Sequence, residues 1–174
     1  MNVKEYIEKN RGRFQEELFS LIRIPSISSD PSHKNDMQEC ALRWKNLLLE
    51  TGVDMLLEAG ADIAEVMPTS ASPVVFAEKI VDRSFPTVLV YAHYDVMPVE
   101  PLELWNTDPF EPVIQDGRLW ARGADDDKGQ SFLQVKAFEI ALREKLLKCN
   151  VKFLFEGGEE IGSHGLEDFC LAHK

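Results

Sequence analysis

The feature that most constrains the fold is a strand–helix–strand pattern in the second half of the chain. Residues 87–91 are β-branched and almost wholly apolar, which is typical of a strand buried on both faces of a sheet. Residues 151–155 form a second apolar run, and helical apolar spacing covers residues 132–148 between them. Two strands joined by a long helix form a crossover unit and should lie parallel in one sheet. We therefore predict an α/β fold with three layers, αβα, around a mostly parallel central sheet.

Two amphipathic helices are expected before this unit, because apolar residues recur every three or four positions in two segments. The first covers residues 3–23, and Pro25 ends it. The second includes residues 37–48 and runs toward Gly52. Helices with this pattern cover a sheet and indicate no function by themselves.

Shorter segments complete the predicted fold. Residues 63–67 and 73–80 are expected to be strands, and residues 113–120 form a hairpin with an Asp-Gly turn. Ser163 is a good N-cap for a last helix over residues 166–173.

Composition restricts the partners of the chain. Its 174 residues suit one domain or a large piece of one, and 30 acidic against 19 basic residues give a net charge of −11. This charge argues against nucleic acid or an anionic membrane as partner. No apolar run is long enough to cross a bilayer, and the N-terminus lacks a signal-peptide core. Cys40, Cys149 and Cys170 are read as reduced thiols, which predicts a cytoplasmic location.

An acidic stretch precedes the crossover helix. Asp125, Asp126 and Asp127 lie between Gly123 and Gly129. Like charges this close repel one another, and a helix N-terminus favours only one or two of them. A third carboxylate beside glycines that permit a tight turn favours a hard or borderline metal cation. For the loop alone, a solvated acidic cap is an equal alternative.

Three groups of ligand-type side chains should converge at one sheet edge. His93 and Asp95 follow the first strand of the crossover unit, and residues 156–160 follow the second. The loop at residues 123–129 precedes the crossover helix, so the start of the helix faces the same edge. In open α/β sheets, sites assemble outside the carboxyl ends of the strands.

These side chains have the chemistry of a hydrolytic metal site. His93 can bind a metal through one ring nitrogen while Asp95 holds the other. Glu159 and Glu160 point in different directions, so one can coordinate a metal while the other faces water as a general base. Asp126 is able to bridge two ions. Zinc fits this mixed set best, and manganese or cobalt could substitute. Taken singly, each residue type is more often structural.

Three motifs, residues 93–95, 122–129 and 156–163, resemble those of the dizinc metallopeptidases. That family includes carnosinase-like dipeptidases, carboxypeptidase G, aminoacylase, acetylornithine deacetylase and succinyl-diaminopimelate desuccinylase. The motifs stand in the family's order and rough spacing, and the likeness covers nearly the whole chain. The loop at residues 96–112 looks most like the carnosinase-like dipeptidase branch.

The resemblance implies a role for each of five residues. His93 would bind one metal ion, Glu160 the other, and Asp126 would bridge both. Asp95 would orient His93, and Glu159 would be the general base that takes a proton from the attacking water. The flanking carboxylates Asp125 and Asp127 receive no catalytic role.

The resemblance also predicts that the site is incomplete. The family pattern needs two more ligands and an inserted lid domain that contacts substrate and commonly dimerises, whereas only 14 of the 174 residues follow Glu160. We expect residues 1–174 to be an N-terminal portion of the catalytic domain, with the lid domain and the C-terminal catalytic segment absent. This portion should bind metal weakly or not at all and be inactive alone. His164 with Asp168, or His173, could replace a missing ligand, although an ordinary terminal helix explains them better.

The predicted activity is metal-dependent hydrolysis of the amide bond of dipeptides, with a parent protein that forms a homodimer through the lid domain. One alternative is an N-acyl-amino-acid deacylase or desuccinylase, because both substrates are amides. A second is a non-catalytic cation-binding or interaction module that keeps the fold. Nucleotide binding is rejected, because Lys128-Gly129 lacks the P-loop order and three aspartates repel phosphate.

Overall fold

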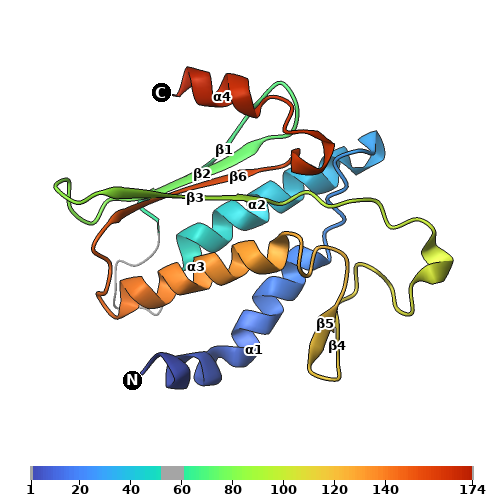
Figure 1. Ribbon diagram of the computed structural model, residues 1–174, viewed down its shortest axis with the longest axis horizontal. Coiled ribbons are helices and arrows are strands. Elements are labelled where there is room, and N and C mark those ends of the chain that lie inside the picture. Colours follow the sequence, from blue (N-terminus) through green and yellow to red (C-terminus); the bar gives the residue numbers. More distant parts are fainter. Residues whose placement is uncertain (1, 52–60, 174) are drawn as a thin grey trace.

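The computed structural model, which describes residues 2–51 and 61–173, is built around a four-stranded sheet (Figure 1). The strands are β1 (Ile63–Met67), β2 (Val74–Lys79), β3 (Thr87–His93) and β6 (Asn150–Glu156). Their order across the sheet is β1-β2-β6-β3. All four strand segments that the sequence indicated are present.

The sheet is mixed, so the expectation of a mostly parallel sheet is wrong. Only β3 and β6 are parallel, whereas β1 pairs antiparallel with β2 and β2 pairs antiparallel with β6. The physical reason is loop length. Short loops after β1 and after β2 reverse the chain each time, and a short connection cannot join parallel strands. β6 then enters between β2 and β3 and runs alongside β3, as the crossover pattern predicted.

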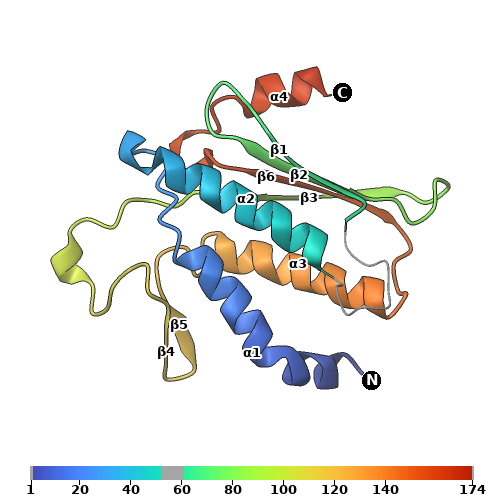
Figure 2. The ribbon, with the colours of Figure 1, turned by 180° about the vertical axis from the view of Figure 1, so that it is seen from behind.

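Helices lie on both faces of the sheet, which confirms the α/β class. The helices α1 (Val3–Ile22), α2 (Lys34–Glu50) and α3 (Lys128–Arg143) lie on one side, and the short α4 (Leu166–Ala172) lies on the other (Figures 1 and 2). The second face therefore has much less helical cover than the first.

Local signals explain where the helices begin and end. Asn2 and Glu5 form a capping box that starts α1. A 3₁₀ turn, η1 (Pro31–His33), leads into α2, which begins three residues before the predicted apolar pattern. α3 also begins earlier than predicted, directly after the acidic loop, and ends at Arg143. Gly52, toward which the second helix was expected to run, lies outside the described residues.

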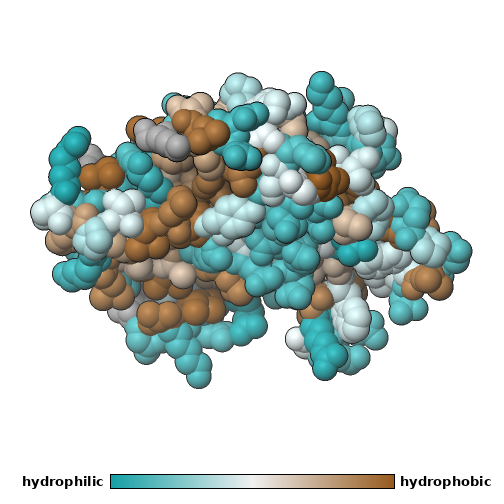
Figure 3. Space-filling view, turned by 45° about the horizontal axis from the view of Figure 1, so that its top comes forward, coloured by the Kyte–Doolittle hydropathy of each residue, from teal (hydrophilic) through white to brown (hydrophobic). Residues whose placement is uncertain are grey.

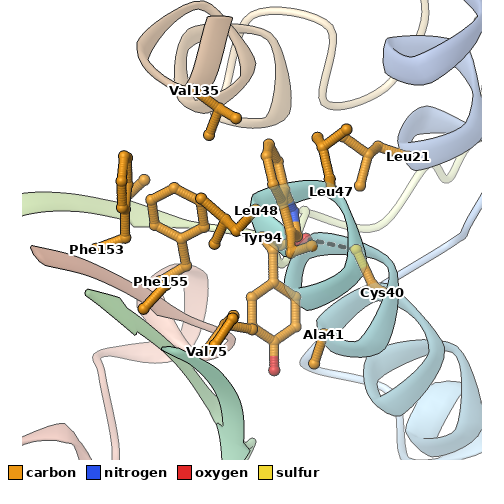
Figure 4. Packing of buried hydrophobic residues seen from close by; sticks show 14 of the residues in the cluster. Leu21, Cys40, Ala41, Leu47, Leu48, Val75, Tyr94, Val135, Phe153 and Phe155 are labelled. Carbon is orange, nitrogen blue, oxygen red and sulfur yellow. Dashed lines mark hydrogen bonds between the residues drawn. The ribbon is translucent and has the colours of Figure 1, made fainter. Parts of the chain in front are cut away.

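The main hydrophobic core lies between the sheet and the three helices on one face. Phe155 of β6 packs on Trp44 of α2, and Phe153 packs on Phe138 of α3. Figure 4 shows both rings together with Leu47 and Leu48 of α2. Phe153 and Phe155 pack edge to face, with ring centroids 5.8 Å apart. Burial of this apolar surface is the main force that holds the sheet against the helices. A smaller cluster on the opposite face joins Val74, Leu154 and Phe169 under α4.

The prediction that residues 87–91 are buried on both faces is wrong. β3 is an edge strand in the described sheet, and Val88 is 47% and Leu89 58% exposed. Viewed from the side of α4, hydrophobic residues gather in patches beside hydrophilic ones (Figure 3). An apolar strand indicates burial only if another element covers it, and here that cover is partial.

The end of the chain differs from its prediction in one detail. Gly165, not Ser163, is the N-cap of α4 and makes no side-chain capping bond. The hydroxyl of Ser163 donates instead to Glu156, at 2.8 Å. A 3₁₀ turn, η3 (Glu159–Ile161), lies between Glu156 and Ser163.

Three smaller features complete the description. The hairpin of β4 (Val113–Gln115) and β5 (Arg118–Trp120) turns at Asp116 and Gly117, both at positive φ, as its sequence predicted. A 3₁₀ turn, η2 (Leu102–Leu104), lies in the long loop before it. None of the helices in the described ranges combines the length and apolarity that a membrane span requires.

Candidate metal centre

The three predicted groups of side chains meet at the carboxyl ends of β3 and β6. His93 ends β3 and is the register partner of Glu156, which ends β6. The acidic loop reaches the same edge, because His93 Nε2 lies 3.0 Å from Asp126 Oδ1. The loop after β6 brings Glu159 Oε2 to 3.8 Å from the same nitrogen. Residues more than 60 positions apart in the sequence thus surround one imidazole.

Asp95 connects His93 to the paired glutamates. It is fully buried, and its Oδ1 lies 3.3 Å from His93 Nδ1. The same oxygen accepts the backbone N–H of Glu159, while Oδ2 accepts that of Glu160, both at 3.2 Å. Asp95 therefore orients the imidazole through its carboxylate and through its backbone carbonyl, which lies 3.2 Å from His93 Nδ1, and its carboxylate also holds the 3₁₀ turn that carries both glutamates. The sequence argument anticipated only the first of these contacts.

The consecutive aspartates of the acidic loop point to different environments. The side chain of Asp126 is 72% exposed and leaves its oxygens open beside His93. Asp127 turns inward, where its Oδ2 accepts the backbone N–H of His93 and the hydroxyl of Ser131 at 2.8 Å. The peptide bond between Asp126 and Asp127 is cis. Asp125 is exposed, and the structure gives it no contact with His93.

Lys128 and Gly129 hold the acidic loop against the rest of the fold. Lys128 is fully buried, and its Nζ donates to the carbonyl of Leu21, in the last turn of α1, at 3.0 Å and to that of Ile24, just after the helix, at 2.7 Å. Burial lowers the pKa of this ammonium group. A Cβ on Gly129 would lie 2.0 Å from the carbonyl oxygen of Ala124, so only glycine permits this approach.

The site has an excess of negative charge, which shifts the pKa of two groups. Burial lowers the pKa of His93, but the hydrogen bond and charge of Asp95, with the charge of Asp127 and the bond to Asp126, raise it to about 9. Burial, followed by the charge of Asp126, raises the pKa of Glu160. Both shifts have the direction expected where carboxylates crowd together. A cation would relieve this repulsion.

The donors suit a small divalent cation. Two ligands on one tetrahedral zinc lie roughly 3.3 Å apart, given metal–ligand bonds of about 2.0–2.1 Å. The 3.0 Å separation of His93 Nε2 and Asp126 Oδ1 is close to this spacing. No three His, Cys, Asp or Glu side chains in residues 2–51 and 61–173 are already arranged around one point. The side chains of Asp126, which is exposed, and of Glu160, which is partly exposed, must therefore turn toward each other to close on an ion.

The two histidines near the C-terminal end of the sequence, His164 and His173, do not join the site. His164 precedes α4, which begins at Leu166, so it cannot form a same-helix pair with Asp168. His173 stacks on Phe169, with ring centroids 4.3 Å apart, and its Nδ1 lies 2.8 Å from the carbonyl of that residue. His164 thus belongs to the segment before α4, and His173 packs against α4 itself.

Sequence reasoning quoted Glu156 within a motif but gave it no role. The available signal was its place in the strand pattern. Partners in a parallel pair project to the same face, so a residue at the carboxyl end of β6 lies beside the residue at the end of β3. Glu156 is only 3% exposed, although it is charged.

The chain is similar to known proteins in sequence and in fold. Residues 89–172 match the sequence profile of Peptidase family M20/M25/M40. Over 171 residues, the chain is 34% identical to the Cys-Gly metallodipeptidase dug1 of Schizosaccharomyces pombe, covering 97% of this chain and 36% of that protein.

Two solved structures share the fold over most of the chain. The M20 family metallo-carboxypeptidase Sso-CP2 from Sulfolobus solfataricus has a TM-score of 0.79 and 35% identity, over 90% of this chain and 33% of its own. Human carnosine dipeptidase 1 has a TM-score of 0.82 and 28% identity, over 95% of this chain and 36% of its own. The chain thus spans about a third of the length of these relatives.

Proposed function

We propose that the chain carries part of a dipeptidase site. The premise is that the chain is related to the metallopeptidases of Peptidase family M20/M25/M40, by sequence over residues 89–172 and by fold over most of its length. One observation supports the proposal above all. The carboxylates of Asp126, Glu159 and Glu160 gather around His93, and none of them has a lysine or arginine partner in the described ranges. Uncompensated carboxylates beside an imidazole are the donor set of a divalent metal site.

Each side chain has a stated task in this proposal. His93 and Asp126 would hold one cation, and Asp126 and Glu160 would hold a second. Asp95 fixes the orientation of the His93 ring and of the glutamate turn. These donors give two protein ligands to each ion, fewer than the three or four of typical zinc sites. Weak binding by this chain is therefore part of the proposal.

Glu159 is the proposed general base. Its side chain is 46% exposed, so its carboxylate can face a water molecule and a substrate carbonyl. It would take a proton from the attacking water and return it to the amine that leaves. Divalent cations, when bound, supply polarisation of the carbonyl and a more acidic water. Glu159 Oε2 and Asp126 Oδ1 lie 3.8 Å and 3.0 Å from His93 Nε2, so the base is beside the same ring nitrogen as Asp126.

The proposed substrates are dipeptides, because the relatives are named as dipeptidases for Cys-Gly and for carnosine. Zinc as the metal, a cytoplasmic location and a dimeric longer parent belong to the same proposal. Reduced thiols support the location, since Cys40, Cys149 and Cys170 are free.

Cation binding and turnover, measured together, test the proposal. Zinc and manganese are titrated calorimetrically into the metal-free chain and into His93→Ala and Glu160→Ala. Hydrolysis of Cys-Gly, carnosine and N-acetyl amino acids is then followed in this chain and in its longer parent. Glu167→Ala, a change at an exposed glutamate of α4, is the matched control.

The outcomes separate the candidate functions. We expect weak binding that both site variants abolish and Glu167→Ala retains, with dipeptide turnover that Glu159→Ala removes. Faster turnover of N-acetyl amino acids would replace the dipeptidase with a deacylase. Binding without any amide turnover, in the parent as well, would indicate the non-catalytic cation-binding module. Binding unaffected by His93→Ala would contradict the proposed centre.

A further inference from the structure

Glu156 is a buried carboxylate to which the proposed chemistry gives no task. It ends β6 beside His93 and is 3% exposed. Its Oε1 accepts hydrogen bonds from two hydroxyl groups, Tyr91 Oη and Ser163 Oγ, the second at 2.8 Å. Burial of a carboxylate is costly unless hydrogen bonds compensate it. A residue with only a packing role at this position would be apolar.

The two donors come from the two sides of the proposed centre. Tyr91 lies on β3, two residues before His93, and therefore on the same face of the strand. Ser163 lies at the far end of the loop that follows β6, after the 3₁₀ turn with Glu159 and Glu160. The carboxylate of Glu156 thus joins the end of this loop to the strand that carries His93.

The loop has a second attachment, at its middle. Asp95 accepts the backbone N–H groups of Glu159 and Glu160, both at 3.2 Å. Ser163 has a φ of 56°, a left-handed conformation that is unfavourable for a residue with a side chain. The bond from its hydroxyl to Glu156 stabilises this conformation. The backbone N–H of Ser163 also donates to the carbonyl of Gly158, at 2.6 Å, and closes the loop on itself. Without the bond from the hydroxyl to Glu156, this closed loop would stay attached at Asp95 but would lose its link to β3.

We propose that Glu156 is a positioning residue for the paired glutamates: by holding Ser163 to Tyr91, it fixes the turn that places Glu159 and Glu160 beside His93. The consequence for metal binding rests on the proposed function. The restraint itself does not, because it exists in the metal-free chain and can be measured there.

Amide hydrogen exchange of the metal-free chain tests the restraint. In Glu156→Gln we expect the Glu159 and Glu160 amides to exchange about tenfold faster, the scale of losing one hydrogen bond to a charged group. The amides of Phe153 and Phe155 in the core of β6 should keep their rates. Ser163→Ala should act like Glu156→Gln, and the double variant should add little because both changes remove the same bond.

A matched control separates this effect from a loss of charge on the sheet. Glu78→Gln removes a carboxylate of the neighbouring strand β2, whose ion pair with Lys152 at 3.1 Å is remote from the loop. It should leave the Glu159 and Glu160 amides unchanged. If Glu156→Gln does not fold, Ser163→Ala and Tyr91→Phe, which each remove only one hydroxyl, decide the question.

Zinc affinity is a second measurement, and it separates a positioning role from a general loss of stability. At unchanged melting temperature, Glu156→Gln and Ser163→Ala should weaken zinc binding by about 10- to 100-fold, as loss of ligand-orienting bonds does. Unchanged exchange in the loop, or equal acceleration of loop and core amides, would overturn the inference. If the unaltered chain binds no zinc, the proposed metal centre fails, and the exchange rates alone decide the role of Glu156.

Discussion

Two regions of the molecule bring ionisable side chains together, and they differ in charge balance. Between α1 and α3, Glu139 accepts from Tyr6 at 2.8 Å and pairs with Lys136 at 2.7 Å and with Arg13. Arg13 also pairs with Glu17 at 2.9 Å. We name these five residues the α1–α3 ion cluster. Its two acidic groups are matched by two basic ones.

At the sheet edge, the balance is different. Four carboxylates, those of Asp95, Asp126, Glu159 and Glu160, gather around a single imidazole, that of His93.

The pKa shifts of two glutamates express this difference. Burial raises the pKa of Glu139, but the bonds from Arg13 and Lys136 outweigh it and lower the pKa overall. Burial and the charge of Asp126 raise the pKa of Glu160. A balanced buried cluster holds two helices together, whereas an unbalanced one at the end of a sheet is suited to bind a cation.

The largest expected effect separates catalysis from stability. In the form of the protein that hydrolyses a dipeptide, Glu159→Gln should lower kcat by about 10²–10⁴-fold, because it removes the proposed general base. Its melting temperature should hardly change, since the side chain is 46% exposed. Glu139→Gln should show the reverse, a lower melting temperature with kcat retained. Equal loss of turnover in the two variants would remove the functional distinction between the regions.

The next effect tests the α1–α3 ion cluster. Lys136→Met leaves the carboxylate of Glu139, which is 3% exposed, without its amine partner. Urea unfolding should show a loss of about 1–3 kcal/mol, less than for a buried charge left with no partner, because Arg13 still pairs with Glu139. Lys152→Met is the control, because its pair with Glu78 is 42% exposed on the lysine side and should contribute about 0–1 kcal/mol. Similar losses in the two variants would mean that a buried ion pair of the cluster contributes no more to the free energy of unfolding than an exposed one.

Acid should weaken the cluster by a smaller amount. The pKa of Glu139 in the folded chain lies below its ordinary value of 4.5, so ionisation of this group stabilises the fold. That contribution is complete above about pH 4.5 and disappears as the pH falls through the lower, folded-state pKa. We therefore measure the free energy of unfolding from about pH 6 downward. It should fall less steeply in Glu139→Gln than in the unaltered chain.

The smallest effect concerns the unbalanced site. Without metal, Asp126→Asn should leave the free energy of unfolding unchanged or raise it by less than about 1 kcal/mol, because it removes one exposed like charge. With zinc, the unaltered chain should melt at a higher temperature than without it, and Asp126→Asn should lose that rise. A marked destabilisation of the metal-free variant would show that Asp126 has a structural role instead.

Much of the fold could be predicted because its signals are local. Apolar spacing marked α1 and α3, and the Asp-Gly turn marked the hairpin before the acidic loop. The crossover unit then predicted that β3 and β6 are parallel, which places His93 beside the loop after β6. The meeting of His93, Asp126 and Glu159 followed from this topology.

Two of the errors share a cause, since each concerns which partner a segment finds outside its own helix or strand. Residues 87–91 have the composition of a buried strand, but exposure of β3 depends on whether another element covers its edge. Ser163 has the composition of an N-cap, but its hydroxyl found the carboxylate of Glu156. Local propensity cannot choose between such partners.

The sequence by itself determined which side chains could do the chemistry and which edge of the sheet would carry them, because helical and strand periodicity depend on neighbouring residues. Only the tertiary structure decided how they are held. Asp95 reaches the backbone of Glu159 and Glu160, and Lys128 reaches the end of α1. These bonds join segments distant in sequence, and their lengths of about 3 Å are set by packing of the whole core.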